Sequence, residues 1–414
     1  MNIREDALRI VDEAIKSVYP ENAVKKALES FENERRIKVL AIGKAAWRMA
    51  KAARESLKER ISEGIVITKY GHSMGRIEGF EILEAGHPIP DENTVKATER
   101  ALDMVKDLRE DGLLLFLVSG GGSSLFELPA QNVELRDLID ITDQLLKSGA
   151  TISEINAVRK HLSKVKGGRF AEIVKPAEIF SLVLSDVLGD KLDAIASGPA
   201  YPDFTTPQDT LRIIQKYGIK LTSRVSSAMN NETPKSLENV KTKIIGSVFI
   251  ACEAAKTAAE KLGYNSMILT ATLDCEAREA GVFLSGIVRE IVSRDRPVKR
   301  PCAMILGGET VVQVKGNGLG GRNQELALSA ARGIEGLDNV VIASVATDGT
   351  DGPTDAAGGI VDGETLMRLR EKGFDVEEAL DNNDSYHALE AAGDLLNTGP
   401  TGTNVNDLIT LLCK

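Results

Sequence analysis

A glycine-rich stretch just ahead of Arg322 has the composition of an anion-binding turn. A segment whose apolar residues recur at helical spacing follows directly after Gly316, Gly318, Gly320 and Gly321. The first N–H groups of a helix lack partners within the helix, and the helix dipole adds positive charge there, so a helix start suits an anion. The guanidinium of Arg322 matches the geometry of phosphate or carboxylate. We therefore predict that a phosphorylated or carboxylated ligand binds at this turn.

Two other interpretations of this stretch stay open. Its glycine spacing also satisfies the fingerprint of a dinucleotide cofactor site, which needs a buried parallel strand before it and an acid about twenty residues later. Here residues 302–306 and 310–314 are predicted to form a hairpin that turns at Gly307–Gly308, and the nearest acid at a strand end, Asp348, lies further along. The other interpretation is a glycine-rich surface turn without a ligand.

A second glycine-rich turn follows the most apolar segment of the chain. Residues 113–118 are all Leu, Phe or Val, as expected of a central parallel strand covered on both faces. Directly after them come Ser119, Gly120, Gly121, Gly122, Ser123 and Ser124. The backbone N–H groups of such a turn can cradle an anion. The turn does not match a Walker A loop, so the sequence predicts a generic anion cradle.

Lys44 stands at another junction between a strand and a helix. The apolar segment Lys38–Ile42 ends at Gly43, and strong helix formers begin at Ala45. A cation at the start of a helix opposes the helix dipole, and a bound phosphate would explain it. The alternative is a solvated lysine in a first helical turn. Because sites in open α/β sheets lie beyond the carboxyl ends of strands, Lys44, Ser119 and Asp186 are predicted at the same edge.

Asp186 and Asp190 follow the predicted strand at residues 180–184. Two acids just past the end of a strand can hold Mg²⁺ or accept the proton of a hydroxyl group. Either acid taken alone can instead cap a helix. The sequence leaves open which acid acts as a base and which binds a metal ion.

Three acids also crowd a loop after the predicted strand at residues 340–346. Asp348, Asp351 and Asp355 alternate there with glycine, threonine and proline. A cation or a hydroxyl partner would relieve the repulsion between these carboxylates, and solvent screening is the alternative.

Basic residues gather in one segment of an otherwise acidic chain. Such a segment is either a solvated helix face or a positive rim that attracts an anionic substrate. His87 precedes Pro88 and is expected to orient a loop rather than to catalyse. The basic segment, residues 155–169, contains Arg159, Lys160, His161, Lys164, Lys166 and Arg169.

The elements that must position these residues alternate between short apolar strands and helices. Apolar residues from Leu8 to Val18 recur at helical spacing, and a βα unit follows. A polar region with several prolines precedes a boundary near residues 234–239, after which the alternation restarts with a strand at 243–250. The predicted domains are therefore residues 1–237 and 238–414.

Composition restricts the class of protein. The chain has 414 residues, enough for two or three domains, and 43% hydrophobic residues, enough for packed cores. Its formal net charge of -10 argues against a nucleic-acid binder. The four cysteines match no zinc spacing and are expected to be buried free thiols in a reducing compartment. Apolar runs are too short to span a bilayer, and the N-terminus does not resemble a secretory signal, so a cytoplasmic protein is expected.

Five motifs in order resemble one family from end to end. They are VSGGGSSL (118–125), LSDVLGDKLDAIASGP (184–199), GGRNQELAL (320–328), ATDGTDGPTDAAGG (346–359) and TGPTGTNVNDL (398–408). Together they are similar to the glycerate 2-kinases of the MOFRL type. The resemblance implies ATP- and Mg²⁺-dependent phosphorylation of the 2-hydroxyl of D-glycerate. It also implies an α/β fold with an N-terminal Rossmann-like α/β/α domain, a smaller C-terminal MOFRL-type α/β domain, and an active site in the cleft between them.

The resemblance assigns roles to the residues singled out above. It points to Lys44, Asp186 and Arg322 as the catalytic residues, with Asp190 as the candidate metal ligand. Because some relatives carry the name hydroxypyruvate reductase, an NAD(P)H-dependent reductase is kept as the alternative function. Expected partners are D-glycerate and a nucleotide, without nucleic acid or membrane, in a monomer or homodimer. Ligand binding is assigned to Ser119, Gly120, Gly121, Gly122, Ser123, Asp190, Gly318, Gly320, Gly321, Asn323, Asp348 and Asp351.

Overall fold

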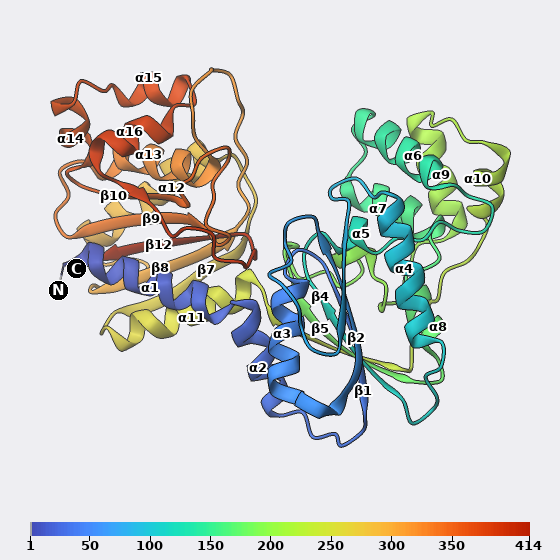
Figure 1. The fold of residues 1–414 in the computed structure, drawn as a ribbon. Coiled ribbons are helices and arrows are strands. Elements are labelled where there is room, and N and C mark those ends of the chain that lie inside the picture. Colours follow the sequence, from blue (N-terminus) through green and yellow to red (C-terminus); the bar gives the residue numbers. More distant parts are fainter. Residues whose placement is uncertain (1) are drawn as a thin grey trace. The chain divides into compact units, whose positions relative to one another are not determined.

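The computed structural model describes residues 2–414, which divide into two compact units (Figure 1). One unit is formed by Pro20–Ile245. The other is formed by Gly246–Lys414 together with the N-terminal residues through Tyr19. Each unit contains one six-stranded sheet with helices packed against it, which confirms the predicted α/β class.

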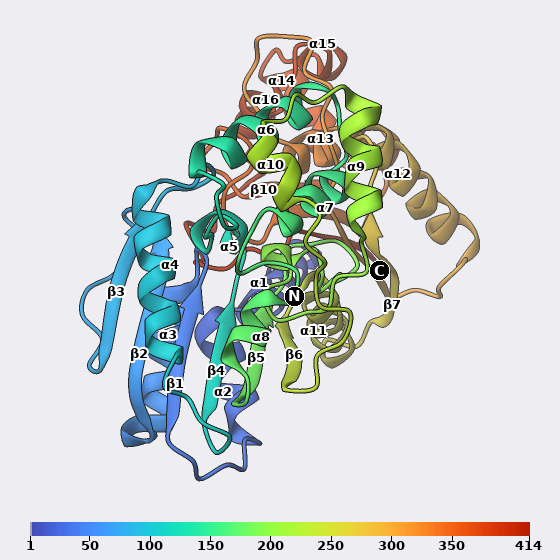
Figure 2. The same ribbon diagram turned by 90° about the vertical axis from the view of Figure 1, so that its right-hand side faces the viewer.

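The sheet of Pro20–Ile245 has the strand order β3-β2-β1-β4-β5-β6, which can be followed in Figure 2. The neighbouring strands from β3 to β5 are all parallel. This is the order of the doubly wound Rossmann fold, in which the chain reverses direction across the sheet between β1 and β4. The strands are β1 (Ile37–Ile42), β2 (Ile61–Lys69), β3 (Phe80–Ala85), β4 (Leu113–Val118), β5 (Glu178–Leu184) and β6 (Val240–Gly246).

Helices cover this sheet because its central strands are apolar on both faces. All six residues of β4 are buried, and alternate residues of a strand point to opposite faces. On one face Leu114, Phe116 and Val118 pack with residues of α4 and α8. The helices are α2 (Pro20–Glu29), α3 (Ala46–Leu57), α4 (Glu92–Val105), α5 (Gly122–Leu125), α6 (Leu135–Lys147), α7 (Ile152–His161), α8 (Arg169–Val174), α9 (Pro207–Tyr217) and α10 (Ser223–Ala228), with short 3-10 turns η1 (Lys58–Arg60) and η2 (Ile195–Ser197).

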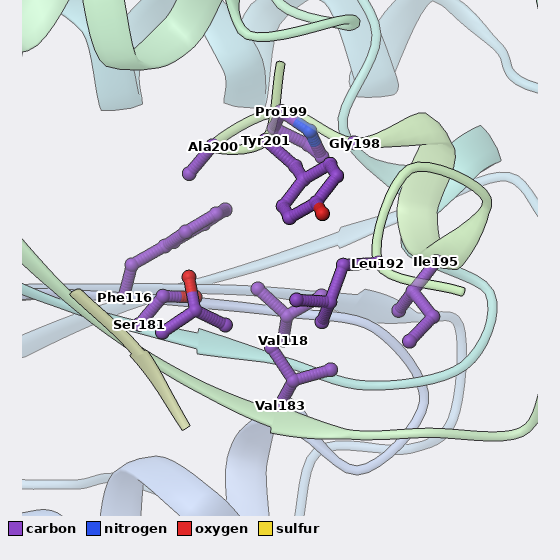
Figure 3. Close-up of a pocket in the computed structure, with 11 residues that line it drawn as sticks. Phe116, Val118, Ser181, Val183, Leu192, Ile195, Gly198, Pro199, Ala200 and Tyr201 are labelled. Atoms are coloured by element: carbon purple, nitrogen blue, oxygen red, sulfur yellow. The ribbon is translucent and has the colours of Figure 1, made fainter. Parts of the chain in front are cut away.

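The segment after β5 is anchored by apolar side chains rather than by regular structure. Leu192 and Ile195 contribute to a small apolar pocket on the sheet and face Val118 and Val183 (Figure 3). Burial of these two side chains stabilises the course of the loop that also carries Asp190. This loop, which contains the short 3-10 turn η2, is thereby held in one place beside the ends of β4 and β5.

The second sheet is mixed and has the order β11-β10-β9-β12-β8-β7. β7 and β8 are parallel, whereas the other neighbouring pairs are antiparallel. Its strands are β7 (Asn265–Leu273), β8 (Cys302–Gly308), β9 (Val340–Ala346), β10 (Gly358–Asp362), β11 (Leu395–Leu396) and β12 (Asp407–Cys413). Its helices are α1 (Ile3–Ser17), α11 (Val248–Lys261), α12 (Ala277–Arg294), α13 (Arg322–Ile334), α14 (Thr365–Glu371), α15 (Val376–Asp381) and α16 (Ser385–Ala392).

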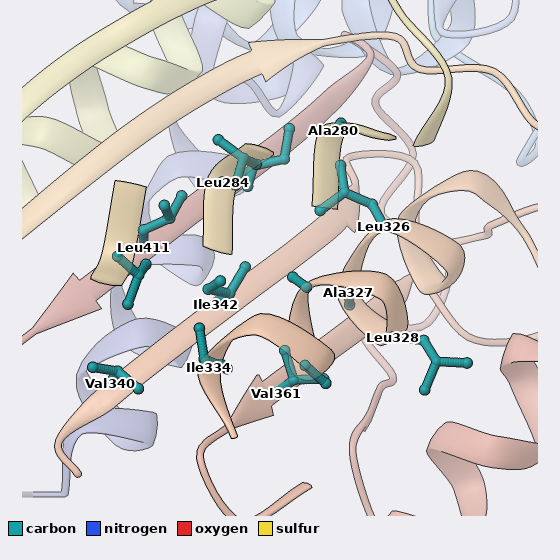
Figure 4. Packing of buried hydrophobic residues seen from close by; sticks show 14 of the residues in the cluster. Ala280, Leu284, Leu326, Ala327, Leu328, Ile334, Val340, Ile342, Val361 and Leu411 are labelled. Carbon is teal, nitrogen blue, oxygen red and sulfur yellow. The ribbon is translucent and has the colours of Figure 1, made fainter. Parts of the chain in front are cut away.

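Helix α13 is the centre of one face of this sheet. Figure 4 shows Leu326, Ala327 and Ile334 of α13 packed among Ile342 of β9 and Leu284 of α12. The sequence predicted an amphipathic helix here, but Asn323–Ala331 is buried throughout. The reason is that α12, α15 and α16 cover the sides of the helix that the sheet does not.

Helix α1 belongs to the second unit although it begins the chain. Ile10 and Ala14 pack with α11 and the sheet, and α1 (blue) lies beside α11 (yellow) in Figure 1. The Asp6 carboxylate accepts hydrogen bonds from Tyr264 Oη at 2.7 Å and Lys414 Nζ at 2.8 Å. At the other junction, β6 completes the first sheet. The compact units thus have other bounds than the predicted domains, residues 1–237 and 238–414, and that division stays a prediction. For α1 the reason is that helical spacing does not reveal which sheet a helix covers.

The predicted hairpin at Gly307–Gly308 is wrong. Both glycines continue β8, where Gly307 pairs with Leu408 and Gly308 with Asp407 of β12. A Cβ atom at Gly307 would lie 2.2 Å from Val248 Cγ2, and one at Gly308 would lie 2.2 Å from Leu273 O. Close packing, rather than a turn, therefore explains the two glycines.

Two predictions from composition can also be compared with the structure. All four cysteines are free; Cys252, Cys302 and Cys413 are buried and Cys275 is partly exposed. Within residues 2–414, no helix combines the length and the apolar character needed to cross a membrane.

Candidate functional site at the switch point between β1 and β4

The carboxyl ends of β1 and β4 are joined by a set of short hydrogen bonds. Ser119 N donates to Ile42 O at 3.0 Å, and Lys44 N donates to Gly120 O at 2.8 Å. The Ser119 hydroxyl accepts from Ala45 N and donates to Ile42 O, both at 3.1 Å. The Ser119 hydroxyl is thus used within the chain, and the assignment of Ser119 to ligand binding stays a prediction. It holds the Lys44 junction against the glycine turn.

Glycine is required at two positions of this turn because other side chains approach the backbone closely there. A Cβ atom at Gly120 would lie 2.1 Å from Asp186 Oδ2. Gly121 has a φ of +83°, and a Cβ atom there would lie 2.9 Å from the His87 ring and 3.2 Å from Lys44 Cγ. Lys44, His87 and Asp186 therefore surround two consecutive glycines, at the edge where crevices form in open α/β sheets.

The N–H groups of this turn are available to a ligand. In the part of the chain that the structure describes, no hydrogen bond uses the N–H of Gly120 or Gly121. The Lys44 ammonium likewise has no hydrogen bond or ion pair within residues 2–414. Unpaired N–H groups beside an unpaired cation form a place that favours an anion. The structure brings Lys44, Asp186 and this turn together, as predicted, while their assigned roles stay predictions.

We expect Gly120→Ala to lower turnover by about tenfold or more, because a displaced reacting group loses alignment. The added methyl group would collide with the Asp186 carboxylate, 2.1 Å away, and would force it from its position. Gly149→Ala is the control for loss of a glycine, since no atom lies within 4 Å of a Cβ atom there, although its φ of +75° makes any residue strained. Steady-state rates and melting curves of both variants test this. Equal turnover of the two variants would contradict the expected role of the Gly120 contact.

Two basic side chains donate hydrogen bonds to the carbonyl groups that follow the glycine turn. Lys166 Nζ donates to Ser123 O at 2.6 Å and to Phe126 O at 3.0 Å, and Arg159 donates to Ser123 O at 3.0 Å. Glu127 lies 3.3 Å from Lys166 Nζ as its carboxylate partner. Burial lowers the pKa of Lys166 to about 8, partly offset by Glu127. These contacts cap the last carbonyl groups of the short helix α5 and hold the turn in place.

The basic segment is therefore not a solvated helix face. Lys160, His161 and Lys166 are buried. Lys160 lies 3.3 Å from both Asp193 and Asp203. This part of the segment is a structural network, and a role in attracting substrate stays a prediction. The sequence did not show it because the acids that pair with these cations lie far along the chain.

Asp190 fits the requirements of a metal ligand at one atom. Its Oδ1 atom is buried and has no hydrogen-bond partner. Carboxylate oxygens suit Mg²⁺, which is commonly bound by one or two carboxylates together with substrate phosphates and water. Within residues 2–414, no group of three or more His, Cys, Asp or Glu side chains could hold a metal ion by itself. Asp190 can therefore contribute one ligand, with the remainder from nucleotide phosphates and water.

The Ser123 hydroxyl is engaged with the loop that carries Asp190. It lies 2.7 Å from the Ser197 hydroxyl, which donates to Asn156 Oδ1 at 3.1 Å. The Ser123 side chain therefore joins the glycine turn to residues 185–199, and its backbone belongs to the turn.

The glycine stretch at residues 316–321 differs from this turn. Lys315 N and Gly316 N both donate to Asn383 Oδ1, at 2.7 and 3.0 Å. Gly318 N donates to Asn382 O at 2.8 Å. A Cβ atom at Gly318 would lie 2.4 Å from Asp384 Cβ. These amide groups are satisfied within the chain, and close approach to residues 382–384 explains the glycines.

The start of α13 is also occupied by the chain itself. Asp351 accepts from Asn323 N at 3.2 Å and from Gln324 N at 2.9 Å. Burial raises the pKa of Asp351, while these N–H groups oppose the rise. A Cβ atom at Gly321 would lie 2.3 Å from Asp351 Cγ. The carboxylate of Asp351 therefore takes the place predicted for a ligand anion, and the helix start relieves the crowding of acids.

Arg322 is held by two acids that the sequence analysis did not connect with it. Its Nε and Nη2 atoms donate to the two oxygens of Asp407 at 2.6 and 3.0 Å, and Nη1 donates to Glu309 at 2.8 Å. Burial raises the pKa of Asp407 to about 6, against the effect of Arg322. Because a guanidinium has five N–H groups, two remain for a ligand.

The other two predicted residues near α13 have internal partners as well. Ser344 Oγ donates to Asn323 Oδ1 at 2.7 Å, and Asn323 is buried. The Asp348 carboxylate accepts from Thr350 N at 3.0 Å and closes its own loop. Their assignment to ligand binding stays a prediction, as it does for Gly318, Gly320 and Gly321.

Fold and site together define a two-unit α/β protein with a glycine turn at the switch point of a doubly wound sheet, where two N–H groups have no partner among residues 2–414. Comparison with known proteins narrows this class. The chain matches the domain of unknown function DUF4147 over residues 6–230 and the MOFRL family over residues 302–407. It is 58% identical over 408 residues to D-glycerate 2-kinase of Thermotoga maritima, covering 99% of this chain and 98% of that protein.

A solved structure agrees with this relative, and one further relative carries a different name. A crystal structure of glycerate kinase from Thermotoga maritima superimposes with a TM-score of 0.97 at 58% identity, covering 99% of each chain. A putative hydroxypyruvate reductase of Agrobacterium vitis is 42% identical, over 100% of this chain and 95% of that one. The chain belongs to the MOFRL-type glycerate 2-kinase family.

Proposed function

We propose that this protein transfers the terminal phosphoryl group of ATP to the 2-hydroxyl of D-glycerate, giving 2-phosphoglycerate and ADP. One observation carries the proposal beyond family membership: an unpaired Lys44 ammonium and the Asp186 carboxylate approach the same glycine turn. Phosphoryl transfer requires charge neutralisation and positioning more than covalent help from the protein. A cation, a carboxylate and unpaired N–H groups within one turn are suited to that task.

Each group has a part in the proposed mechanism. The Asp186 carboxylate orients the 2-hydroxyl and accepts its proton as the oxygen attacks phosphorus. Lys44 and the N–H groups of Gly120 and Gly121 offset the negative charge on the transferring group. Arg322 is proposed to use its two remaining N–H groups in the same way, with Asp407 and Glu309 holding the guanidinium.

Magnesium is proposed as the cofactor, with Asp190 as its protein ligand. The buried Oδ1 atom of Asp190, which lacks a hydrogen-bond partner, supports this assignment. When bound, Mg²⁺ would neutralise charge on the nucleotide phosphates. The residues of the chain itself would bind and orient the hydroxy acid.

A nicotinamide-dependent reductase is not favoured. That function would need the glycine stretch at residues 316–321 to receive a pyrophosphate. The N–H groups of Gly316 and Gly318 are bonded to residues 382–383, and Asp351 occupies the start of α13. A pyrophosphate would have to displace all of these contacts.

The first test is direct. We expect ATP, Mg²⁺ and D-glycerate to give ADP and 2-phosphoglycerate, identified by the phosphorus–proton coupling in the NMR spectrum, and we expect chelation of Mg²⁺ to stop the reaction. NADH with hydroxypyruvate should give no enzyme-dependent loss of absorbance. Formation of 3-phosphoglycerate alone would contradict the position of attack. Absence of turnover with D-glycerate, or steady oxidation of NADH, would contradict the kinase function.

A further inference from the structure

His87 lies closer to the glycine turn than its place in the sequence suggests. It follows β3, a strand at the edge of the sheet, yet its ring lies 2.9 Å from the position of a Cβ atom on Gly121. Lys44 Cγ lies 3.2 Å from the same position. The imidazole and the lysine thus flank one glycine, and Asp186 approaches the glycine before it.

The surroundings of His87 are positively charged. Burial lowers the pKa of His87, and Lys44, Lys69 and His72 lower it further. At neutral pH the ring is therefore uncharged and offers one N–H donor. Its ring has no hydrogen-bond partner among residues 2–414.

The two acids closest to His87 along the sequence have other partners. Glu84 accepts from the N–H groups of Gly71 and Ser73, at 3.0 and 3.1 Å. Asp91 caps α4 and accepts from Tyr70 Oη at 2.6 Å. Positively charged groups beside an unpaired imidazole favour an anionic group.

We propose that His87 and one of the three N–H donors of Lys44 bind the carboxylate of the acceptor and thereby set its 2-hydroxyl against Asp186. This inference rests on the proposed function and specifies the substrate class as 2-hydroxy acids. In such an acid the hydroxyl and the carboxylate are on adjacent carbons. Cα atoms of consecutive residues are about 3.8 Å apart, so groups facing Gly120 and Gly121 can contact both functional groups of one small molecule.

The arrangement accounts for the position of phosphorylation. With its carboxylate on Lys44 and His87, D-glycerate presents the 2-hydroxyl to Asp186, while the 3-hydroxyl is one carbon further away. His87 would then be a specificity-determining residue that contacts substrate. A purely structural role would instead affect all acceptors and ATP alike.

The test compares His87→Ala with the wild type on two acceptors, D-glycerate and its uncharged methyl ester. Loss of a hydrogen bond to a charged group should raise KM for D-glycerate by roughly ten- to a hundredfold. The KM for ATP and the constants for the ester should change by less than about threefold, within the range of indirect effects. Calorimetric titration of D-glycerate without ATP provides a readout that does not depend on turnover.

Further variants distinguish a direct contact between His87 and the substrate from a structural effect. His87→Gln retains an N–H donor and should recover part of the affinity for D-glycerate. His387→Gln is the control for loss of an imidazole, because its ring bonds the Asp384 carboxylate at 2.7 Å and has no part in the proposed subsite, and it should leave KM for D-glycerate nearly unchanged. If the wild type binds D-glycerate without phosphorylating it, the proposed function fails and the subsite stands. Equal losses on D-glycerate and ester in folded His87→Ala, or tighter binding of the ester by the wild type, would overturn the subsite.

Discussion

Asp186→Asn is expected to lower kcat by about 10²- to 10⁴-fold, the range typical of a lost general base. The amide keeps the size of the side chain and its approach to Gly120, where the carboxylate oxygen lies 2.1 Å from the position of a Cβ atom. It cannot accept the hydroxyl proton. Because D-glycerate would still bind through its carboxylate, KM for D-glycerate should change little. The loss should therefore lie almost entirely in kcat.

The matched control for this variant is Asp193→Asn in the same loop. Asp193 lies 3.3 Å from Lys160 and does not approach the glycine turn, so its loss should affect stability more than catalysis. Single-turnover rates and melting temperatures of both variants separate the two effects. A kcat for Asp186→Asn within about threefold of the wild type would remove Asp186 from the role of base. Parallel losses in both variants would indicate that this loop matters only as structure.

The site at the switch point could be predicted because its signals are local. Each of three apolar runs is followed by polar residues or glycine, which places those residues at strand ends. They are Gly43–Lys44, Ser119–Gly122 and Asp186. The rule for open α/β sheets then places them at one edge. No knowledge of side-chain packing was needed for that step. Which atoms stay unpaired, however, became clear only from the hydrogen bonds.

Glycine is ambiguous in a sequence, and this explains the errors elsewhere. Gly121 is needed for a positive φ, Gly120 for the approach of Asp186, Gly308 for the packing of Leu273, and Gly318 for the approach of Asp384. All four look the same in the sequence. Only the contacts separate an open turn with unpaired N–H groups from one whose N–H groups are bonded to a distant loop.

His87 and the partners of Arg322 were missed for a related reason. The His87 ring reaches Gly121 from the end of the edge strand β3, and Asp407 reaches Arg322 from β12. Neither contact has a periodic or short-range signal in the sequence. Similarly, the spacing in α1 predicted a buried face correctly at Val11, Ile15 and Val18, whereas Leu8 is exposed. The spacing could not show that α11 and the second sheet bury this face.

Arg322→Lys is expected to reduce turnover by roughly thirty- to a thousandfold, equivalent to about 2–4 kcal/mol of barrier, by analogy with a lost oxyanion donor. Arginine holds both oxygens of Asp407 and Glu309 and still has two N–H groups for a phosphoryl oxygen. Lysine keeps the charge but cannot span two oxygens with a planar fork. The two bonds to buried Asp407 would also weaken, so the melting temperature should fall by about 2–4 °C.

The effects on stability and on catalysis can be separated with Asp407→Asn. This variant removes the charge of the acid that bonds Arg322 and leaves the guanidinium itself unchanged. If Arg322 serves only to hold β12 against α13, the two variants should lose turnover in proportion to their loss of stability. If Arg322 contacts the transferring group, Arg322→Lys should lose far more turnover than Asp407→Asn at the same melting temperature. Arg322→Ala should then regain activity when guanidinium is added at concentrations that do not unfold the protein. If guanidinium gives no rescue and the two variants lose turnover in proportion to stability, Arg322 is a structural residue. The phosphoryl charge would then be neutralised by Lys44 and the N–H groups of the glycine turn.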